Sequence, residues 1–185
     1  MLQLLIYDSP SDFPRELAQQ ICSALLKEWP SPDADDSVES LIHPELHPTY
    51  FILADGNRLL SYARTTWVTL EYGAQRFKLY GLSDVMTVPE YRHKGYGDRI
   101  VHEATAHIRS DPEADVALLL TRPELAVLYQ RSGWEHVPEL RVESGEDERH
   151  EASDAFPMML FLSAAACTAR ASFASHTLVL PGDDW

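Results

Sequence analysis

The chain has 185 residues, of which 45% are hydrophobic and 24% are charged, proportions typical of a soluble globular protein. This length suits one domain with its own core, so we expect residues 1–185 to form a single domain. The formal net charge of −14 argues against a nucleic-acid-binding protein, which needs a basic face. Solubility explains the charge well enough, but the charge also suits a cationic substrate.

The sequence shows neither a clear targeting signal nor a cysteine pattern typical of a metal site. The first residues, MLQLLIYDSP, lack the basic segment and the cleavage site of a signal peptide. The apolar run FPMMLFLSAAAC, residues 156–167, is too short to span a bilayer. We therefore expect a cytoplasmic protein that does not bind membranes. Cys22 and Cys167 match no metal-ligand spacing and have apolar neighbours, which predicts two buried free thiols.

Hydrophobic periodicity and turn residues predict a series of short elements in the first half of the chain. They are a strand over 2–7, a turn over 8–12 that can cap the next helix, a helix over 14–29, and a short helix around 38–46. The pair Asp55-Gly56 then predicts a β-hairpin with strands over 50–54 and 59–71. A long strand over 76–88 follows, antiparallel to its predecessor.

The sequence of the second half of the chain predicts alternating helices and strands. The elements are a helix over 98–110, a buried strand over 115–121, a helix opened by Pro123 and ended by Gly133, a polar loop over 144–154, and closing strands over 157–163 and 177–180 around an Ala-rich connection. Because a helix separates the strands over 76–88 and 115–121, we expect these two strands to be parallel. In the helix after Pro123, the residues Leu125, Leu128 and Tyr129 should share a face.

The stretch LSDVMTVPEYRHKGYG, residues 82–97, organises the chain. It reads as a buried strand that stops at Pro89, a turn that contains Gly95 and Gly97, and then a helix. The first turn of a helix has unpaired N–H groups and a dipole that favours anions, so the stretch predicts a phosphate-binding site. Both glycines should let the backbone approach a phosphate and adopt conformations closed to other residues. An ordinary strand-to-helix turn is the alternative. Positive charge beside the turn comes from Arg92, His93 and Lys94.

The pattern Arg-x-x-Gly-x-Gly in this stretch resembles the acetyl-CoA pyrophosphate loop of the GNAT superfamily of N-acetyltransferases. A second segment, LAVLYQRSGW, resembles the GNAT signature in which a helix carries a tyrosine, then a glycine and an aromatic residue; here these are Tyr129, Gly133 and Trp134. The order of the predicted elements is also the GNAT order. The resemblance implies a mixed α/β (α+β) fold, whose largely antiparallel sheet splays between its fourth and fifth strands and is flanked by helices.

The resemblance also implies acetyl-CoA as co-substrate, with no metal. Backbone groups of Met86, Thr87 and Val88 would pair with the pantetheine arm, and the Val88 N–H would act as an oxyanion hole. Thr121 and Arg122 would lie beside the cofactor, although many relatives have an asparagine near here and this chain does not. The pyrophosphate would take N–H groups from the loop residues Arg92, His93, Lys94, Gly95, Tyr96 and Gly97.

Two side chains are candidates for proton transfer. In the family, the tyrosine at the position of Tyr129 often points at the sulfur of acetyl-CoA, so Tyr129 could protonate the leaving thiolate; a core tyrosine is the alternative. An amine must lose a proton before it attacks, and Asp84 is the best candidate base. Period-2 alternation places it with Met86 and Val88 on one face of a buried strand. Alternatively, Asp84 lies at a solvated edge or pairs with an arginine. Glu71 is the second choice.

Within GNAT, the chain is most similar to aminoglycoside 2′-N-acetyltransferases. These proteins carry an acidic residue at the strand position of Asp84 and a Leu-Tyr-x-x-x-Gly-Trp segment. They also end in Gly-Asp-x-Trp, which Gly182 to Trp185 match. The resemblance implies that Asp84, Asp183, Asp184 and Trp185 bind a cationic acceptor, since each fixed anion can pair with an ammonium group. Val85, where these enzymes tend to have glycine, and the segment 43–48 depart from the family.

We therefore predict an N-acetyltransferase that acts on a small cationic amine, such as an aminoglycoside. One alternative is transfer to a protein N-terminus or lysine, and another is an acyl-CoA-binding module without catalysis. The eight histidines show no ligand spacing, because Pro44 breaks the helix that would align His43 and His47. The apolar C-terminal strands could serve as a homodimer interface.

Overall fold

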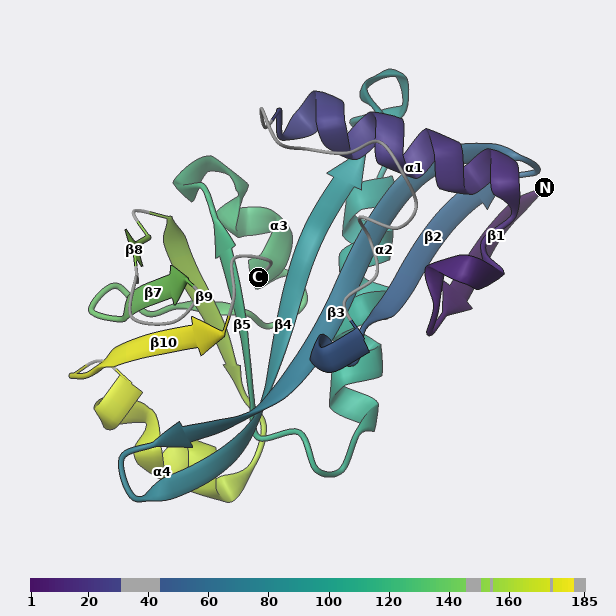
Figure 1. The fold of residues 1–185 in the computed structure, drawn as a ribbon. Coiled ribbons are helices and arrows are strands. Elements are labelled where there is room, and N and C mark those ends of the chain that lie inside the picture. Colours follow the sequence, from purple (N-terminus) through teal and green to yellow (C-terminus); the bar gives the residue numbers. More distant parts are fainter. Residues whose placement is uncertain (31–43, 146–150, 154, 174, 182–185) are drawn as a thin grey trace. The chain divides into compact units, whose positions relative to one another are not determined.

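The computed structural model describes residues 1–30, 44–145, 151–153, 155–173 and 175–181 (Figure 1). Two compact units make up the chain. The first comprises Met1–Thr66 and Asp84–Thr105, and the second comprises Trp67–Ser83 and Ala106–Trp185. Three elements run from one unit into the other: strand β3 (Arg58–Tyr72), strand β4 (Gln75–Thr87) and helix α2 (Tyr96–Ser110).

The main sheet has seven strands in the order β1-β2-β3-β4-β5-β9-β6. The pairs β1–β2, β2–β3, β5–β9 and β6–β9 are antiparallel, and β4–β5 is parallel. This topology confirms the predicted fold class, including the parallel pair that a helix separates. The remaining strands of this sheet are β1 (Leu2–Tyr7), β2 (Thr49–Asp55), β5 (Val116–Thr121), β6 (Glu135–His136) and β9 (Phe156–Phe161).

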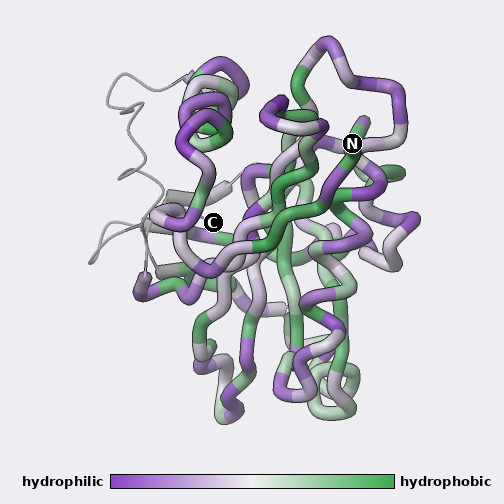
Figure 2. The backbone as a smooth tube through the Cα atoms, turned by 90° about the vertical axis from the view of Figure 1, so that its right-hand side faces the viewer, coloured by the Kyte–Doolittle hydropathy of each residue, from purple (hydrophilic) through white to green (hydrophobic). Residues whose placement is uncertain are grey.

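Helix α1 (Arg15–Glu28) builds the core of the first unit with strands β2 and β3. Leu17 and Ile21 recur at helical spacing, and both are almost completely buried. They pack with Tyr50 and Ile52, which alternation places on one face of β2. Figure 2 shows this pattern along the backbone: hydrophilic and hydrophobic residues interchange within the turns of the helices.

The turn over residues 8–12 was predicted to cap helix α1, and the structure shows a different role. Ser9 caps a short 3-10 helix, Pro10–Asp12, by accepting a hydrogen bond from the Ser11 N–H. The N-cap of α1 is Pro14, and no side chain caps that helix. The prediction that residues 8–12 cap the helix is therefore wrong, because a separate 3-10 turn intervenes. Of the predicted helix around 38–46, residues 38–43 lie outside the described residues, and Pro44–Leu46 form a 3-10 turn.

The second unit has its own core, built around aromatic side chains. Tyr72 at the end of β3 stacks on Phe173 with ring centroids 4.5 Å apart, and its hydroxyl donates to the carbonyl oxygens of Ser172 and His176. Phe173 ends helix α4 (Ala164–Phe173), which replaces the short Ala-rich connection that the sequence predicted. Cys167 on this helix is exposed, which corrects the prediction of a buried thiol, whereas Cys22 is buried.

A separate three-stranded sheet with the order β10-β7-β8 completes the second unit. Its strands are β7 (Arg141–Gly145), β8 (Glu151–Ala152) and β10 (Thr177–Pro181). The prediction of a loop over 144–154 is wrong at both of its ends, since β7 and β8 form there. The strand over 177–180 is confirmed, but it pairs in parallel with β7. Within the described ranges, no helix has both the length and the apolar character needed to cross a membrane.

Gly133 ends the short helix α3 (Ala126–Gln130) with a left-handed backbone, φ +89°. A Cβ there would stand 2.8 Å from the Arg109 Nη2, which donates to the Ser132 carbonyl. We expect Gly133→Ala to lower the free energy of unfolding by about 1–2 kcal/mol in urea denaturation. The matched control is Gly73→Ala, because Gly73 has φ +62° but open space around its Cβ position. Equal losses in both variants would show that the Arg109 contact contributes nothing.

A polar network joins β4 to the loop after α2. Lys78 lies 2.7 Å from the Asp111 Oδ2, which also accepts a 2.7 Å hydrogen bond from the Tyr80 hydroxyl. The Lys78 ammonium sits over the Trp67 ring at 4.1 Å. Burial alone would raise the pKa of Asp111, but the hydrogen bonds from Lys78, the Glu113 N–H and Tyr80 lower it from 3.8 to about 2. The carboxylate is therefore more stable in the folded state than in the unfolded state.

This network predicts an acid-sensitive contribution to stability. A lowered pKa stabilises the fold at pH values above the unfolded value of 3.8, and this stability is lost as the pH falls from about 5 to about 2. The expected contribution is about 2 kcal/mol, measured by urea denaturation across that pH range. In Asp111→Asn this part of the pH dependence should disappear. Glu113→Gln is the control, because the Glu113 side chain is 80% exposed and should leave the slope unchanged.

Candidate active site

Asp84 lies on β4 with an unusual backbone and a fixed side chain. Its φ is +55°, a left-handed value that a non-glycine residue rarely adopts within a strand. Its Oδ2 lies 3.0 Å from the Arg64 Nε; the Arg64 side chain is 6% exposed and that of Asp84 is 25% exposed. The structure thus shows the arginine pair that the sequence left open as an alternative to a catalytic base, and a quarter of the Asp84 side chain stays exposed.

The end of β4 has most of its backbone groups already engaged. The Ser61 hydroxyl donates to the Met86 carbonyl at 2.6 Å and lies 3.0 Å from the Thr87 hydroxyl. The Val88 N–H donates to the Leu60 carbonyl at 3.0 Å. A backbone N–H has one hydrogen to give, so the prediction that the Val88 N–H acts as a free oxyanion donor is wrong for this structure.

Arg92 supports the loop from the side of α1. Its Nε donates to the Thr87 carbonyl at 3.0 Å, and its Nη2 lies 2.6 Å from the Glu28 Oε2. Its backbone N–H donates to the Pro89 carbonyl. The prediction that this N–H binds the pyrophosphate is therefore corrected: Arg92 braces the loop against α1, and the candidate donors begin at His93.

The loop from His93 to Gly97 presents a row of backbone N–H groups. His93 has φ +63° and Gly95 has φ +82°, so left-handed residues alternate with ordinary ones. Successive N–H groups in such a conformation point to one side and form an anion-binding concavity. Within the part of the chain that the structure describes, no group accepts a hydrogen bond from the N–H groups of residues 93–97. The loop is thus prepared for an anion.

The two glycines of the loop have different roles. Gly95 needs the left-handed conformation, and open space surrounds its Cβ position. Gly97 lies in the first turn of α2, which begins at Tyr96, and it is not among the residues with positive φ. The expectation that both glycines adopt conformations closed to other residues holds only for Gly95. Lys94 adds positive charge here; its Nζ donates to the Glu90 carbonyl and lies 5.2 Å from the centre of the Tyr91 ring.

In the second unit, Tyr129 lies on α3, which follows a 3-10 turn over Pro123–Leu125. The tyrosine is 6% exposed. Burial raises its pKa above 10, although a hydrogen bond with Thr121 and the charge of Arg122 lower it in part. The structure thus brings together three predicted residues, and it keeps the Tyr129 hydroxyl protonated at neutral pH. Leu125 does not share the buried face, because it belongs to the 3-10 turn and is exposed.

The parallel pairing of β4 with β5 ends early. Only Leu79–Gly81 pair with Val116–Leu118, whereas β5 continues to Thr121 and pairs with β9 along its whole length. This early end agrees with the predicted splay between the fourth and fifth strands. It leaves backbone groups from Leu119 to Thr121 without a paired strand on that side among the described residues.

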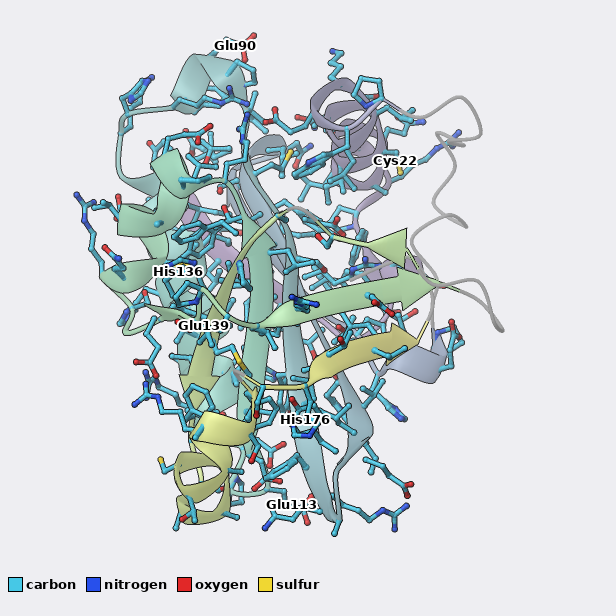
Figure 3. The ribbon with its side chains drawn as sticks, turned by 90° about the vertical axis from the view of Figure 1, so that its left-hand side faces the viewer. Cys22, Glu90, Glu113, His136, Glu139 and His176 are labelled. Atoms are coloured by element: carbon cyan, nitrogen blue, oxygen red, sulfur yellow. The ribbon has the colours of Figure 1, made fainter. Side chains whose placement is uncertain are left out.

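A cavity of about 900 Å³ lies within the first unit, between α1, the start of β3 and the end of β4. Met86, Thr87, Val88 and Arg92 line it, so four predicted cofactor residues meet at one surface. Glu90, labelled in Figure 3, lies at its rim on the 3-10 turn Pro89–Tyr91. Sequence reasoning gave no signal for this cavity, because helix α1 contributes polar residues that resemble an ordinary solvated face.

Other candidates lie elsewhere or outside the described residues. Glu71 is 74% exposed and pairs with Arg76 near the end of the β3–β4 hairpin. Asp183, Asp184 and Trp185 lie outside the described residues. A smaller cavity of about 490 Å³ in the second unit is lined by His136 and Glu139 (Figure 3), and no predicted site residue contributes to it. Among the described residues, no group of three His, Cys, Asp or Glu side chains could hold a metal ion.

Residues 16–137 match the family model for the acetyltransferase (GNAT) domain. The chain belongs to the GNAT family. The match covers both candidate segments, the loop of residues 92–97 and the helix that carries Tyr129. No curated protein matches the sequence significantly.

Solved structures share the fold of this GNAT domain at low sequence identity. A GNAT family N-acetyltransferase from Escherichia coli, YhbS, in complex with CoA, has 16% identity and a TM-score of 0.60, with 99% of this chain and 91% of that chain covered. Arabidopsis thaliana NAA60 in complex with acetyl-CoA has 13% identity and a TM-score of 0.60, with 88% and 99% covered. These likenesses support the fold alone.

One similar structure is much longer than this GNAT domain. A conserved Enterococcus faecalis protein, described as a probable N-acyltransferase, has 17% identity and a TM-score of 0.57 over 74% of this chain. The chain spans 33% of the length of that protein. The GNAT fold therefore occurs there within a larger chain, whereas YhbS and NAA60 are of similar length to the present one.

Proposed function

We propose that this GNAT domain transfers the acetyl group of acetyl-CoA to the amine of a small cationic acceptor. The observation that carries the proposal is the row of N–H groups at residues 93–97, directly before α2. It combines unpaired donors, a left-handed glycine and the positive end of a helix of 15 residues. The pyrophosphate of CoA has the charge and the acceptor atoms that this loop requires.

The proposed chemistry is direct transfer in a ternary complex. The amine nitrogen uses its lone pair to form the N–C bond, and the C–S bond breaks with its electrons going to sulfur. Asp84 takes the nitrogen proton through a water molecule, and Tyr129 donates its proton to the thiolate. The Tyr129 hydroxyl is protonated at neutral pH and so has a proton to give, although burial raises its pKa and thereby makes it a weaker acid.

The acceptor class rests on charge and on the resemblance to aminoglycoside 2′-N-acetyltransferases. The net charge of −14 and the acidic tail Gly182-Asp183-Asp184-Trp185 suit an acceptor with several ammonium groups. Asp84 would contribute a further anion, because a quarter of its side chain is exposed despite the pair with Arg64. An aminoglycoside meets these requirements, and so does a linear polyamine.

The test is the release of CoA from acetyl-CoA in the presence of aminoglycosides, polyamines and lysine peptides. Turnover with an aminoglycoside that is lost when Asp183–Trp185 are deleted would support the proposed acceptor and its site. Turnover with peptides alone would favour a protein N-terminus or lysine as acceptor. Tight acetyl-CoA binding without turnover on any amine, and indifference to Tyr129→Phe, would indicate an acyl-CoA-binding module.

A further inference from the structure

Two buried hydroxyl groups find no hydrogen-bond partner among the described residues: those of Tyr62 and Thr66. Both residues are completely buried. They lie on β3 at positions i and i+4, so they share one face of the strand with Arg64 between them. A buried hydroxyl without a partner is costly, and it often marks the place of a bound water molecule or ligand.

The same face carries the ion pair of the candidate base. Arg64 is held inside the unit, whereas its partner Asp84 is partly exposed and has a left-handed backbone. Residues in such conformations persist where the surrounding structure holds them, and they concentrate at functional sites. The Asp84 Oδ2 lies 3.0 Å from the Arg64 Nε, and a quarter of the Asp84 side chain remains exposed.

The charges of Asp84 and Arg64 both affect the pKa of the Tyr62 hydroxyl. Burial raises the pKa of Tyr62 well above 10; the charge of Asp84 raises it further, whereas Arg64 lowers it. The other groups that act on Tyr62 are Tyr50 on β2 and Cys22 on α1. Burial likewise raises the pKa of Tyr50, to about 12. Both phenols are therefore protonated at neutral pH, and Asp84 is the carboxylate whose charge acts on both of them.

We propose that Tyr62 is a positioning residue, whose hydroxyl holds the water molecule through which Asp84 takes the proton of the attacking amine. This inference rests on the proposed function. In the step, the water gives one proton to the Asp84 carboxylate while it receives one from the nitrogen, so the water is regenerated. The full burial of Tyr62 favours water over the acceptor itself as its partner, since a water molecule fits where a larger amine does not.

The test compares Tyr62→Phe with Thr66→Val, which removes the other unpartnered hydroxyl of the same face. Both variants should melt at the temperature of the parent or above it, because each removes a buried polar group without a partner. Tyr62→Phe should lower kcat about 10- to 100-fold and move the acidic limb of the kcat profile to higher pH, with the KM for acetyl-CoA unchanged. Thr66→Val should keep kcat within about 2-fold. A Tyr62→Phe variant with the parent's kcat and pH profile would overturn the proposal.

A crystal structure of the parent at high resolution gives a readout that is independent of activity. We expect one ordered water molecule bonded to both the Tyr62 hydroxyl and the Asp84 carboxylate. A direct bond between the two side chains, or an empty apolar position beside the hydroxyl, would overturn the proposal. If the water is present but the parent acetylates no amine, the proposed function fails and the positioning role of Tyr62 in proton transfer fails with it, whereas the water site itself stands.

Discussion

Replacing Asp84 by asparagine is expected to lower kcat by at least 100-fold with the best acceptor of the panel, while acetyl-CoA still binds. The amide cannot accept the amine proton as the carboxylate does, yet it keeps the size of the side chain. The measurement is steady-state CoA release, together with calorimetric titration of acetyl-CoA. A variant with more than a tenth of the parent's kcat would show that the proton leaves by another route.

The same substitution should also destabilise the fold, and this effect needs its own control. The Arg64 side chain is 6% exposed, and Asp84→Asn removes the carboxylate charge that lies 3.0 Å from its Nε. We expect a loss of about 3 kcal/mol in the free energy of unfolding. The double variant Arg64→Met with Asp84→Asn should recover most of that stability but none of the activity. Recovery of activity in the double variant would mean that Asp84 has only a structural role.

Replacing Gly95 by alanine is expected to weaken CoA binding by about 10-fold, because alanine draws the free loop out of the left-handed backbone and binding must restore it at a cost of roughly 1–2 kcal/mol. Its methyl group would also stand in the open space around the Gly95 Cβ position. Calorimetric titration of CoA measures the effect.

The matched control for the phosphate loop is Gly56→Ala in the β2–β3 hairpin. Gly56 has φ +57° and open space around its Cβ position, so the backbone cost is similar, and it lies outside the loop of residues 92–97. Gly56→Ala should lose about 1 kcal/mol of stability and keep the parent's affinity for CoA, whereas Gly95→Ala should lose affinity. Equal affinities in the two variants would contradict the assignment of the loop as the pyrophosphate site.

The sequence predicted those parts of the fold whose signals are local. The Asp55-Gly56 turn, the alternation along β3 and β4, and the helical spacing in α1 each lie within a few residues. The second sheet was missed because β8 has two residues and β7 lies in a polar stretch, so neither shows a clear period. Helix α4 was missed because an Ala-rich run between two strands resembles a connection as much as a helix.

The candidate site shows a different limit of sequence reasoning. The residue types of the loop could be predicted, but the partners of their backbone groups depend on contacts between distant segments. The Leu60 carbonyl accepts the hydrogen bond of the Val88 N–H. The Glu28 carboxylate accepts a hydrogen bond from the Arg92 guanidinium, although 64 residues separate these two. For Asp84, the sequence allowed an arginine partner but could not identify Arg64, because the pair depends on the register of neighbouring strands.

The division of the chain into two units has a consequence for its synthesis. The chain leaves the first unit after Thr66, returns at Asp84 and leaves again after Thr105. Domains tend to fold in order as they emerge from the ribosome. Here the first unit lacks its last segment until residue 105 has emerged, by which time part of the second unit is already exposed. A nascent chain that ends near residue 83 therefore presents apolar strands without their final neighbours. The order in which the segments are connected thus creates a need for protection from aggregation at that stage.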